Sequence, residues 1–194
     1  FLADAARWAI SNKTSVTADI GVMNAGGVRD DLDSGEVTYA EAFAVQPFGN
    51  EITYTRLTGE QFKKALEQQW KDGGERPVLS LGVSDNVSYV YDVEAPAGER
   101  IKSVTVDGEP LDPEREYVVA GSTFLLEGGD SFSALAEGSE LAATGLMDIE
   151  AFVSYLRDNE DAAPRAGQSN VSVHLPEKVA AGEGGKPPVC LLCF

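Results

Sequence analysis

The sequence predicts an α/β (α+β) fold in which a mixed β-sheet core is covered by helices. Helical and strand-like hydrophobic patterns occur in the same chain, without the strict alternation that an all-parallel sheet requires. At 194 residues and 43% hydrophobic content, the chain is also long enough to bury a sizeable core.

Four helices are predicted, two of them from capping signals in the first half of the chain. Residues 2–10 have the pattern of the end of a helix. Thr38 with Glu41, and Thr58 with Gln61, have the spacing of capping boxes, so helices should run over 39–45 and 59–71. Near the end, Asp148 is expected to cap a helix over 149–159.

Strand-like segments lie between and after these helices. The dipeptide Asp107-Gly108 predicts a hairpin turn that follows the strand at 101–106. A short apolar run at 20–23 leads into a glycine turn, as expected for a buried strand that feeds a binding loop. The predicted strands are 20–23, 52–57, 87–91, 101–106, 117–120 and 171–173.

The chain is predicted to contain one domain over residues 1–175, followed over 176–194 by a tail that is disordered or not native to the protein. The tail holds the chain's two cysteines, Cys190 and Cys193, without a second pair that would complete a zinc site. Because the sequence opens on Phe1 without a methionine, it is interpreted as a fragment of a larger protein.

Composition excludes several classes of function. With 15 basic and 32 acidic residues, the formal charge is −17, which argues against binding nucleic-acid polymers or anionic membranes. No apolar run is long enough for a transmembrane segment. With one histidine, the sequence offers no plausible centre for bond-breaking chemistry, so no catalytic residue, metal ligand or cofactor is predicted in this chain.

Three loop segments carry the groups that would hold a nucleotide. Arg29 follows Gly26 and Gly27, and its guanidinium offers two parallel donors to a phosphate. Phe48 lies in a Pro-Phe-Gly turn, and Phe124 shortly precedes a Gly-Gly-Asp turn. Two such rings could stack on a base, since each contact of this kind contributes about 1–3 kcal/mol. Taken singly, each of these residues is more often structural.

The Gly-Gly-Asp turn supplies the remaining group. Asp130, after Gly128 and Gly129, could accept hydrogen bonds from vicinal ribose hydroxyls. As an alternative, it is an ordinary turn or helix-capping aspartate.

At these residues the chain resembles the C-terminal domain of the 5′-nucleotidase family, from about residue 1 to 173. Five motifs match in order, which is far more specific than any one alone. They are Asn24-Ala25-Gly26-Gly27-Val28-Arg29-Asp30, Gly35-Glu36-Val37-Thr38, Val45-Gln46-Pro47-Phe48-Gly49-Asn50, Leu57-Thr58-Gly59 and Thr123-Phe124 with Gly128-Gly129-Asp130.

The resemblance implies a role for each matched position. Phe48 and Phe124 would sandwich the base, Asn24 would hydrogen-bond the base edge, Asp130 would hold the ribose, and Arg29 would touch the phosphates. The substrate-binding set is then Asn24, Gly26, Gly27, Arg29, Phe48, Asn50, Phe124, Gly129 and Asp130. The chain departs from the family pattern at Thr123, where asparagine is usual, and at Ser131, where glycine commonly follows the aspartate.

The resemblance also implies a partner. In the family, an N-terminal metallophosphatase domain with two divalent metal ions cleaves the phosphate ester, so the full-length protein would be a secreted, periplasmic or cell-surface 5′-nucleotidase. This fragment alone would bind a nucleotide or nucleoside without hydrolysing it. A 2′,3′-cyclic nucleotide phosphodiesterase/3′-nucleotidase, a nucleotide-sugar hydrolase and a non-catalytic surface binding module remain alternatives.

Overall fold

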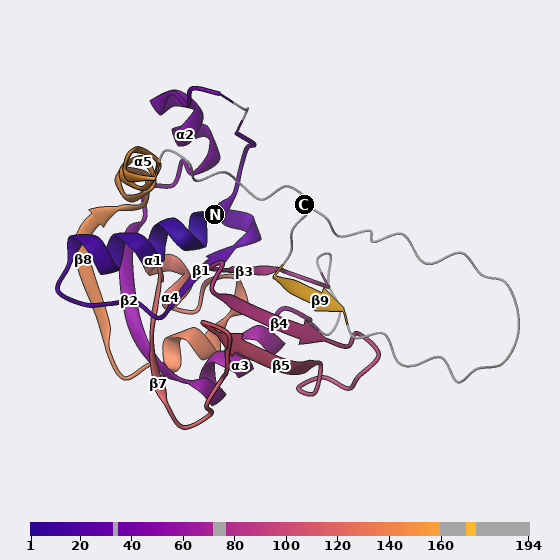
Figure 1. Ribbon diagram of the computed structural model, residues 1–194. Coiled ribbons are helices and arrows are strands. Elements are labelled where there is room, and N and C mark those ends of the chain that lie inside the picture. The colour runs from indigo at the N-terminus through magenta and orange to yellow at the C-terminus, as the bar shows by residue number, and fades with distance from the viewer. Residues whose placement is uncertain (33–34, 72–76, 160–169, 174–194) are drawn as a thin grey trace, which may run out of the picture.

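The computed structural model describes residues 1–32, 35–71, 77–159 and 170–173. Within these residues the strands form two sheets (Figure 1), and the predicted fold class is confirmed. The larger sheet has the order β3-β1-β7-β2-β8, in which β1 and β7 are parallel and the other neighbours antiparallel. Its strands are β1 (Ile20–Asn24), β2 (Glu51–Thr58), β3 (Leu81–Val83), β7 (Glu116–Ser122) and β8 (Leu141–Met147).

The smaller sheet has the order β6-β5-β4-β9 and packs its apolar residues into the same core as the larger one. Its strands are β4 (Val87–Tyr91), β5 (Ile101–Val106), β6 (Glu109–Pro110) and β9 (Val171–Val173). The predicted hairpin turn is confirmed, with Asp107 and Gly108 both at positive φ (53° and 82°), as a type I′ turn requires.

Helices cover both faces of the larger sheet. Figure 1 shows α1 (Leu2–Lys13) lying across it, with α5 (Asp148–Asp158) and α2 (Tyr39–Val45) beyond. The small side chains of α1 let it approach β1 so closely that a Cβ atom on Gly21 would lie 1.9 Å from the Ala3 carbonyl oxygen. On the opposite face lie α3 (Gly59–Glu67) and α4 (Thr123–Leu126).

The central strand β7 is buried on both faces. Val118 and Ala120 belong to the core beneath α1, whereas Tyr117 and Val119 belong to the core that includes Phe62 of α3. Alternate side chains of one strand therefore join two hydrophobic cores. A third cluster fixes α2 and α5 against α1.

Both predicted capping boxes are confirmed, with the side chains of Thr38 and Thr58 accepting hydrogen bonds from the backbone N–H groups of Glu41 and Gln61. For α3, which was predicted to run over 59–71, the predicted end at residue 71 is wrong. The helix stops at Glu67, and Trp70 instead forms a β-bridge with Val78.

The other differences lie at element ends and in the second half of the chain. The first helix extends to Lys13, and Asp148 is the first residue of α5, so the N-cap position falls on Met147, whose side chain makes no capping hydrogen bond. The predicted capping role of Asp148 is therefore wrong. The strand β8 and the short helix α4 were not predicted. The predicted tail at 176–194 lies outside the described residues.

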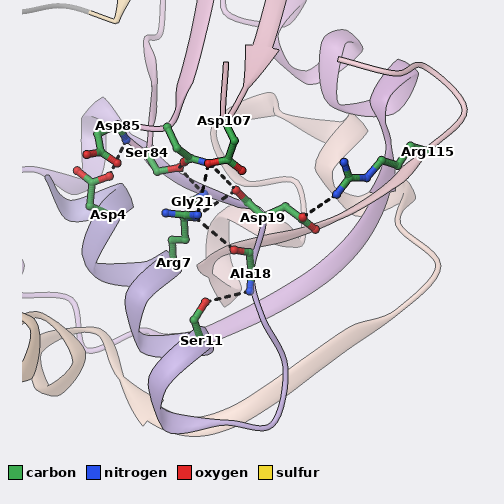
Figure 2. Close-up of polar contacts among 11 residues, drawn as sticks. Asp4, Arg7, Ser11, Ala18, Asp19, Gly21, Ser84, Asp85, Asp107 and Arg115 are labelled. Atoms are coloured by element: carbon green, nitrogen blue, oxygen red, sulfur yellow. Dashed lines mark hydrogen bonds and ion pairs between the residues drawn. The ribbon is translucent and has the colours of Figure 1, made fainter. Parts of the chain in front are cut away.

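Polar contacts fix the amino end of β1 to α1 and to the segments that precede β4 and β7, as Figure 2 shows. The Arg7 Nε donates to the backbone oxygens of Ala18 and Asp19 at 3.3 and 3.2 Å. The Asp19 carboxylate accepts from Arg115 at 3.1 Å, and the Ser84 hydroxyl accepts from the Gly21 N–H at 2.9 Å. With this end held, the opposite end of β1 can carry a loop in a fixed position.

Candidate functional site

A cleft of about 290 Å³ lies at one edge of the larger sheet. The parallel strands β1 and β7 both end at this edge, and the antiparallel β2 begins there. The loop after β1, the loop before β2 and the segment after β7 therefore meet. Eight of the nine predicted site residues line the cleft, namely Asn24, Gly26, Gly27, Arg29, Phe48, Asn50, Phe124 and Asp130.

The two predicted phenylalanines are half-exposed. Phe48 is 51% and Phe124 47% exposed, so each presents much of its ring to the cleft or to solvent. The guanidinium carbon of Arg29 lies 5.4 Å from the centre of the Phe48 ring. Phe124 is carried by α4, whose first turn is capped by the hydroxyl of Ser122.

Gly129, the ninth predicted residue, does not line the cleft but lies behind Phe124. A Cβ atom at this position would be 2.6 Å from two atoms of the Phe124 ring and 2.5 Å from its backbone oxygen. Only glycine allows the ring and this turn to approach so closely. Gly129 therefore supports one wall of the cleft.

Asn24 and Asp130 come together across the cleft. The Asn24 Nδ2 donates to Asp130 Oδ2 at 2.5 Å, and Asn24 itself is 4% exposed at the end of β1. A side chain on Gly26 would begin 3.1 Å from the same carboxylate oxygen. The buried amide and the bare backbone of the glycine turn thus set the position of the Asp130 carboxylate.

The turn that carries Asp130 has a left-handed backbone at residues other than glycine. Asp130 has φ 53° and Ser131 φ 70°, a conformation that costs most side chains about 1–2 kcal/mol. Lys71 holds this turn by donating to the Asp130 backbone oxygen at 2.9 Å and to the Ser131 hydroxyl at 3.1 Å.

Substituting Ser131→Gly is expected to raise the free energy of unfolding by about 0.5–1 kcal/mol, because glycine adopts this backbone without strain. Urea unfolding followed by tryptophan fluorescence measures the change. Ser154→Gly, in the middle of α5, is the matched control and should lower stability. A loss of stability in both variants would contradict the interpretation of strain.

Asn50 connects the loop that bears Phe48 to the start of α5. The carboxylate oxygen Oδ2 of Asp148 accepts from the backbone N–H of Asn50 at 3.0 Å and from its side-chain Nδ2 at 3.3 Å. The other oxygen accepts from the Ile149 N–H at 2.7 Å. The side-chain amide of Asn50 is thus engaged in holding the loop, although the residue lines the cleft.

Asp148 is 1% exposed, and burial raises the pKa of its carboxyl above 3.8, the value of an unperturbed aspartate, against the opposing effect of the hydrogen bonds from Asn50 and Ile149. A raised pKa in the folded state means that this group stabilises the protein most below pH 3.8 and less as pH rises through the folded-state pKa.

A comparison of the wild type with Asp148→Asn isolates this effect, because the variant lacks the titrating group. The free energy of unfolding of the wild type relative to the variant is expected to fall as the pH rises from about 3 toward 7. Urea unfolding at several pH values measures it. A relative stability that increases with pH would mean that the folded-state pKa is lowered.

Arg29 is an exposed cation at the rim of the cleft. The other residues that line the cleft carry no positive charge. The backbone N–H of Arg29 donates to Val45 O at 2.9 Å, and its Nη1 donates weakly to Gly26 O at 3.4 Å. The guanidinium retains further donors, so it can meet an anion. The site therefore places a cation, two aromatic rings and a carboxylate around one cleft.

The sequence did not point to three further residues in the cleft lining, which are Met23, Gln46 and Ser122. Among the described residues, no group of three or more His, Cys, Asp or Glu side chains could hold a metal ion. None of the helices in the same part of the chain has the length and apolar character of a membrane-spanning segment.

Comparison with known proteins gives consistent matches. Residues 1–137 match the family described as 5′-nucleotidase, C-terminal domain. The silent protein UshA(0) of Salmonella typhimurium is 33% identical over 80% of this chain, and the trifunctional nucleotide phosphoesterase protein YfkN of Bacillus subtilis is 30% identical over 88%. The crystal structure of a 5′-nucleotidase precursor from Thermus thermophilus superimposes with a TM-score of 0.74 and 32% identity over 89% of this chain.

The chain spans only part of each of these proteins. It covers 27% of the Salmonella protein, 12% of the Bacillus protein and 34% of the Thermus chain.

Proposed function

Because the chain belongs to the family of 5′-nucleotidase C-terminal domains, we propose that its cleft is the nucleotide-binding site of a larger metal-dependent 5′-nucleotidase. The observation that carries the proposal is the pair of half-exposed rings, Phe48 and Phe124, lining one cleft with Arg29 and Asp130. The two half-exposed rings offer faces on which a flat base can stack, and stacking contributes about 1–3 kcal/mol per base.

Each polar group then has a role that its chemistry supports. The Asp130 carboxylate accepts hydrogen bonds from the vicinal ribose hydroxyls, and the Arg29 guanidinium donates to a phosphate. Asn24 contacts the edge of the base and orients Asp130 through its amide. Gly26 and Gly27 allow the ligand to approach the backbone, since neither carries a side chain that would fill the cleft.

Hydrolysis belongs, in this proposal, to an N-terminal metallophosphatase domain of the same protein. Two divalent metal ions there would activate a water molecule and stabilise charge on the phosphate. In this proposal, this chain binds the substrate and presents it to that domain, which carries out the cleavage. We place the binding domain at 1–175 and a tail at 176–194, in a protein that is secreted, periplasmic or on the cell surface.

A second candidate has support from one comparison. The similarity to a Bacillus protein named as a trifunctional nucleotide phosphoesterase favours a nucleotide ester hydrolase of broader range, such as a 2′,3′-cyclic nucleotide phosphodiesterase/3′-nucleotidase. The same base-binding cleft would serve either enzyme. Assays of the full-length protein with each ester class separate the two.

Titration of adenosine and AMP into the 194-residue chain tests the proposal by calorimetry. Saturable binding of one ligand per chain is expected, with AMP favoured through Arg29. Dideoxyadenosine, which lacks both ribose hydroxyls, should bind more weakly because it offers no donor to Asp130. No saturable binding of adenosine or AMP at millimolar concentration would overturn the proposed function.

A further inference from the structure

Two glutamines are almost completely buried, but the protein satisfies only one of them. Gln69 is 4% exposed, and its Oε1 accepts from the Leu81 N–H at 3.0 Å and from the Tyr89 hydroxyl at 3.1 Å. Its Nε2 donates to the Leu66 backbone oxygen at 2.9 Å. Every polar atom of this amide has a partner, as is normal for a buried side chain.

Gln46 is 5% exposed and has no comparable partners among the described residues. Within that part of the chain, its Nε2 donates only to the thioether sulfur of Met23, at 3.9 Å, and its Oε1 accepts no hydrogen bond. A thioether is a weak acceptor, so the amide keeps nearly all of its hydrogen-bonding capacity. Gln46 lines the cleft, and its side-chain oxygen is not among the fully buried polar atoms, so water or a ligand in the cleft can reach the amide.

The position of Gln46 makes the hydrogen-bonding groups of its amide available to a ligand in the cleft. The residue follows α2 and directly precedes the turn that carries Phe48, and it lines the cleft together with Met23. The methyl group of Met23 fills the space beside Gly27, where a Cβ atom would approach it to 2.5 Å. The buried part of the cleft thus presents a soft apolar side chain and one unpaired amide to the ligand.

A primary amide is suited to one kind of base edge. Its oxygen accepts from an exocyclic amino group while its NH₂ group donates to the adjacent ring nitrogen, the pairing by which glutamine recognises adenine. Building on the nucleotide-binding role proposed above, we infer that Gln46 selects bases that carry this amino group, 6-aminopurines and 4-aminopyrimidines. Gln46 is then a specificity-determining residue.

The decisive experiment compares adenosine with purine riboside, which has hydrogen in place of the 6-amino group. The wild type is expected to bind adenosine roughly tenfold more tightly, the effect of one hydrogen bond to an otherwise unpaired buried group. In Gln46→Met, the two nucleosides should bind equally, and purine riboside should bind more weakly than it does to the wild type, because the hydrogen bond to its ring nitrogen is lost as well. Gln46→Glu keeps an acceptor oxygen and should retain the preference for adenosine.

Thermal unfolding separates this role from a structural one. Gln46→Met should leave the midpoint nearly unchanged, because within the described residues the amide makes only a weak contact with the Met23 sulfur. The matched control, Gln69→Met, should lower the midpoint and leave the ratio of the two affinities as in the wild type.

The outcomes distinguish the two proposals. If the wild type binds both nucleosides equally, or if Gln46→Met keeps the preference for adenosine, the inference about Gln46 is overturned while the nucleotide-binding function stands. If the wild type binds neither nucleoside, the proposed function itself fails, and the inference falls with it.

Discussion

Replacing Phe48 and Phe124 together with alanine is expected to abolish saturable adenosine binding at millimolar concentration. Both side chains line the cleft and are about half-exposed, so truncation removes stacking surface without removing a buried part of the core. Each single substitution should weaken binding by about 5- to 150-fold, which corresponds to about 1–3 kcal/mol of stacking energy per ring. Calorimetric titration of the three variants measures the losses.

A control of the same chemistry is available on α2. Phe43 is 46% exposed, close to the values for the two cleft phenylalanines, but it does not line the cleft. Phe43→Ala should therefore bind adenosine with wild-type affinity. If the double variant in the cleft also bound like the wild type, base stacking between these rings would be excluded.

Replacing Asp148 with alanine is expected to have the largest effect on stability. The substitution leaves the Asn50 and Ile149 N–H groups without their acceptor. Since each buried donor left unpaired costs about 1–3 kcal/mol, the free energy of unfolding should fall by about 2–4 kcal/mol. Because Asn50 closes the loop that bears Phe48, adenosine binding should weaken as well.

Glu150→Ala provides the matched control for this experiment. Glu150 lies in the first turn of the same helix but is exposed, so its removal should change stability by less than about 0.5 kcal/mol. Urea unfolding at neutral pH measures both variants. Equal and small effects would show that the hydrogen bonds of Asp148 contribute little to stability.

The elements that could be predicted from the sequence are those specified by local chemistry. Thr38 and Thr58 set the starts of two helices because a hydroxyl and an acidic or amide side chain three residues later satisfy each other's backbone donors. The end of α3 was missed because Trp70 continues the helical spacing of apolar residues. In the folded protein, the bridge between Trp70 and Val78 replaces that last turn.

Strand β8 was missed for a different reason. Its seven residues, Leu141–Met147, include two alanines and a glycine with φ 75°, and Thr144 is the single β-branched or aromatic residue among them. Pairing with β2 determines the strand, and such long-range pairing leaves no local pattern in the sequence.

The same limit applies to the site. Phe48, Phe124 and Asp130 stand out because their types are unusual in glycine-rich turns. Gln46 lies in the matched motif at 45–50, but the sequence does not show that it is buried or that its amide faces the cleft. Only the folded arrangement reveals that this amide, unlike that of Gln69, lacks comparable partners among the described residues.

The parallel pairing of β1 with β7 also has a kinetic consequence. It joins Ile20 to Val119 and brings Asn24, the last residue of β1, to Asp130 across 106 positions of the chain. Contacts of such high sequence separation carry a large loop-closure cost and form slowly during folding. The helices and the β4–β5 hairpin can form before this pairing, but the cleft cannot. Recovery of ligand binding during refolding therefore reports the closure of the whole sheet, whereas recovery of helical signal does not.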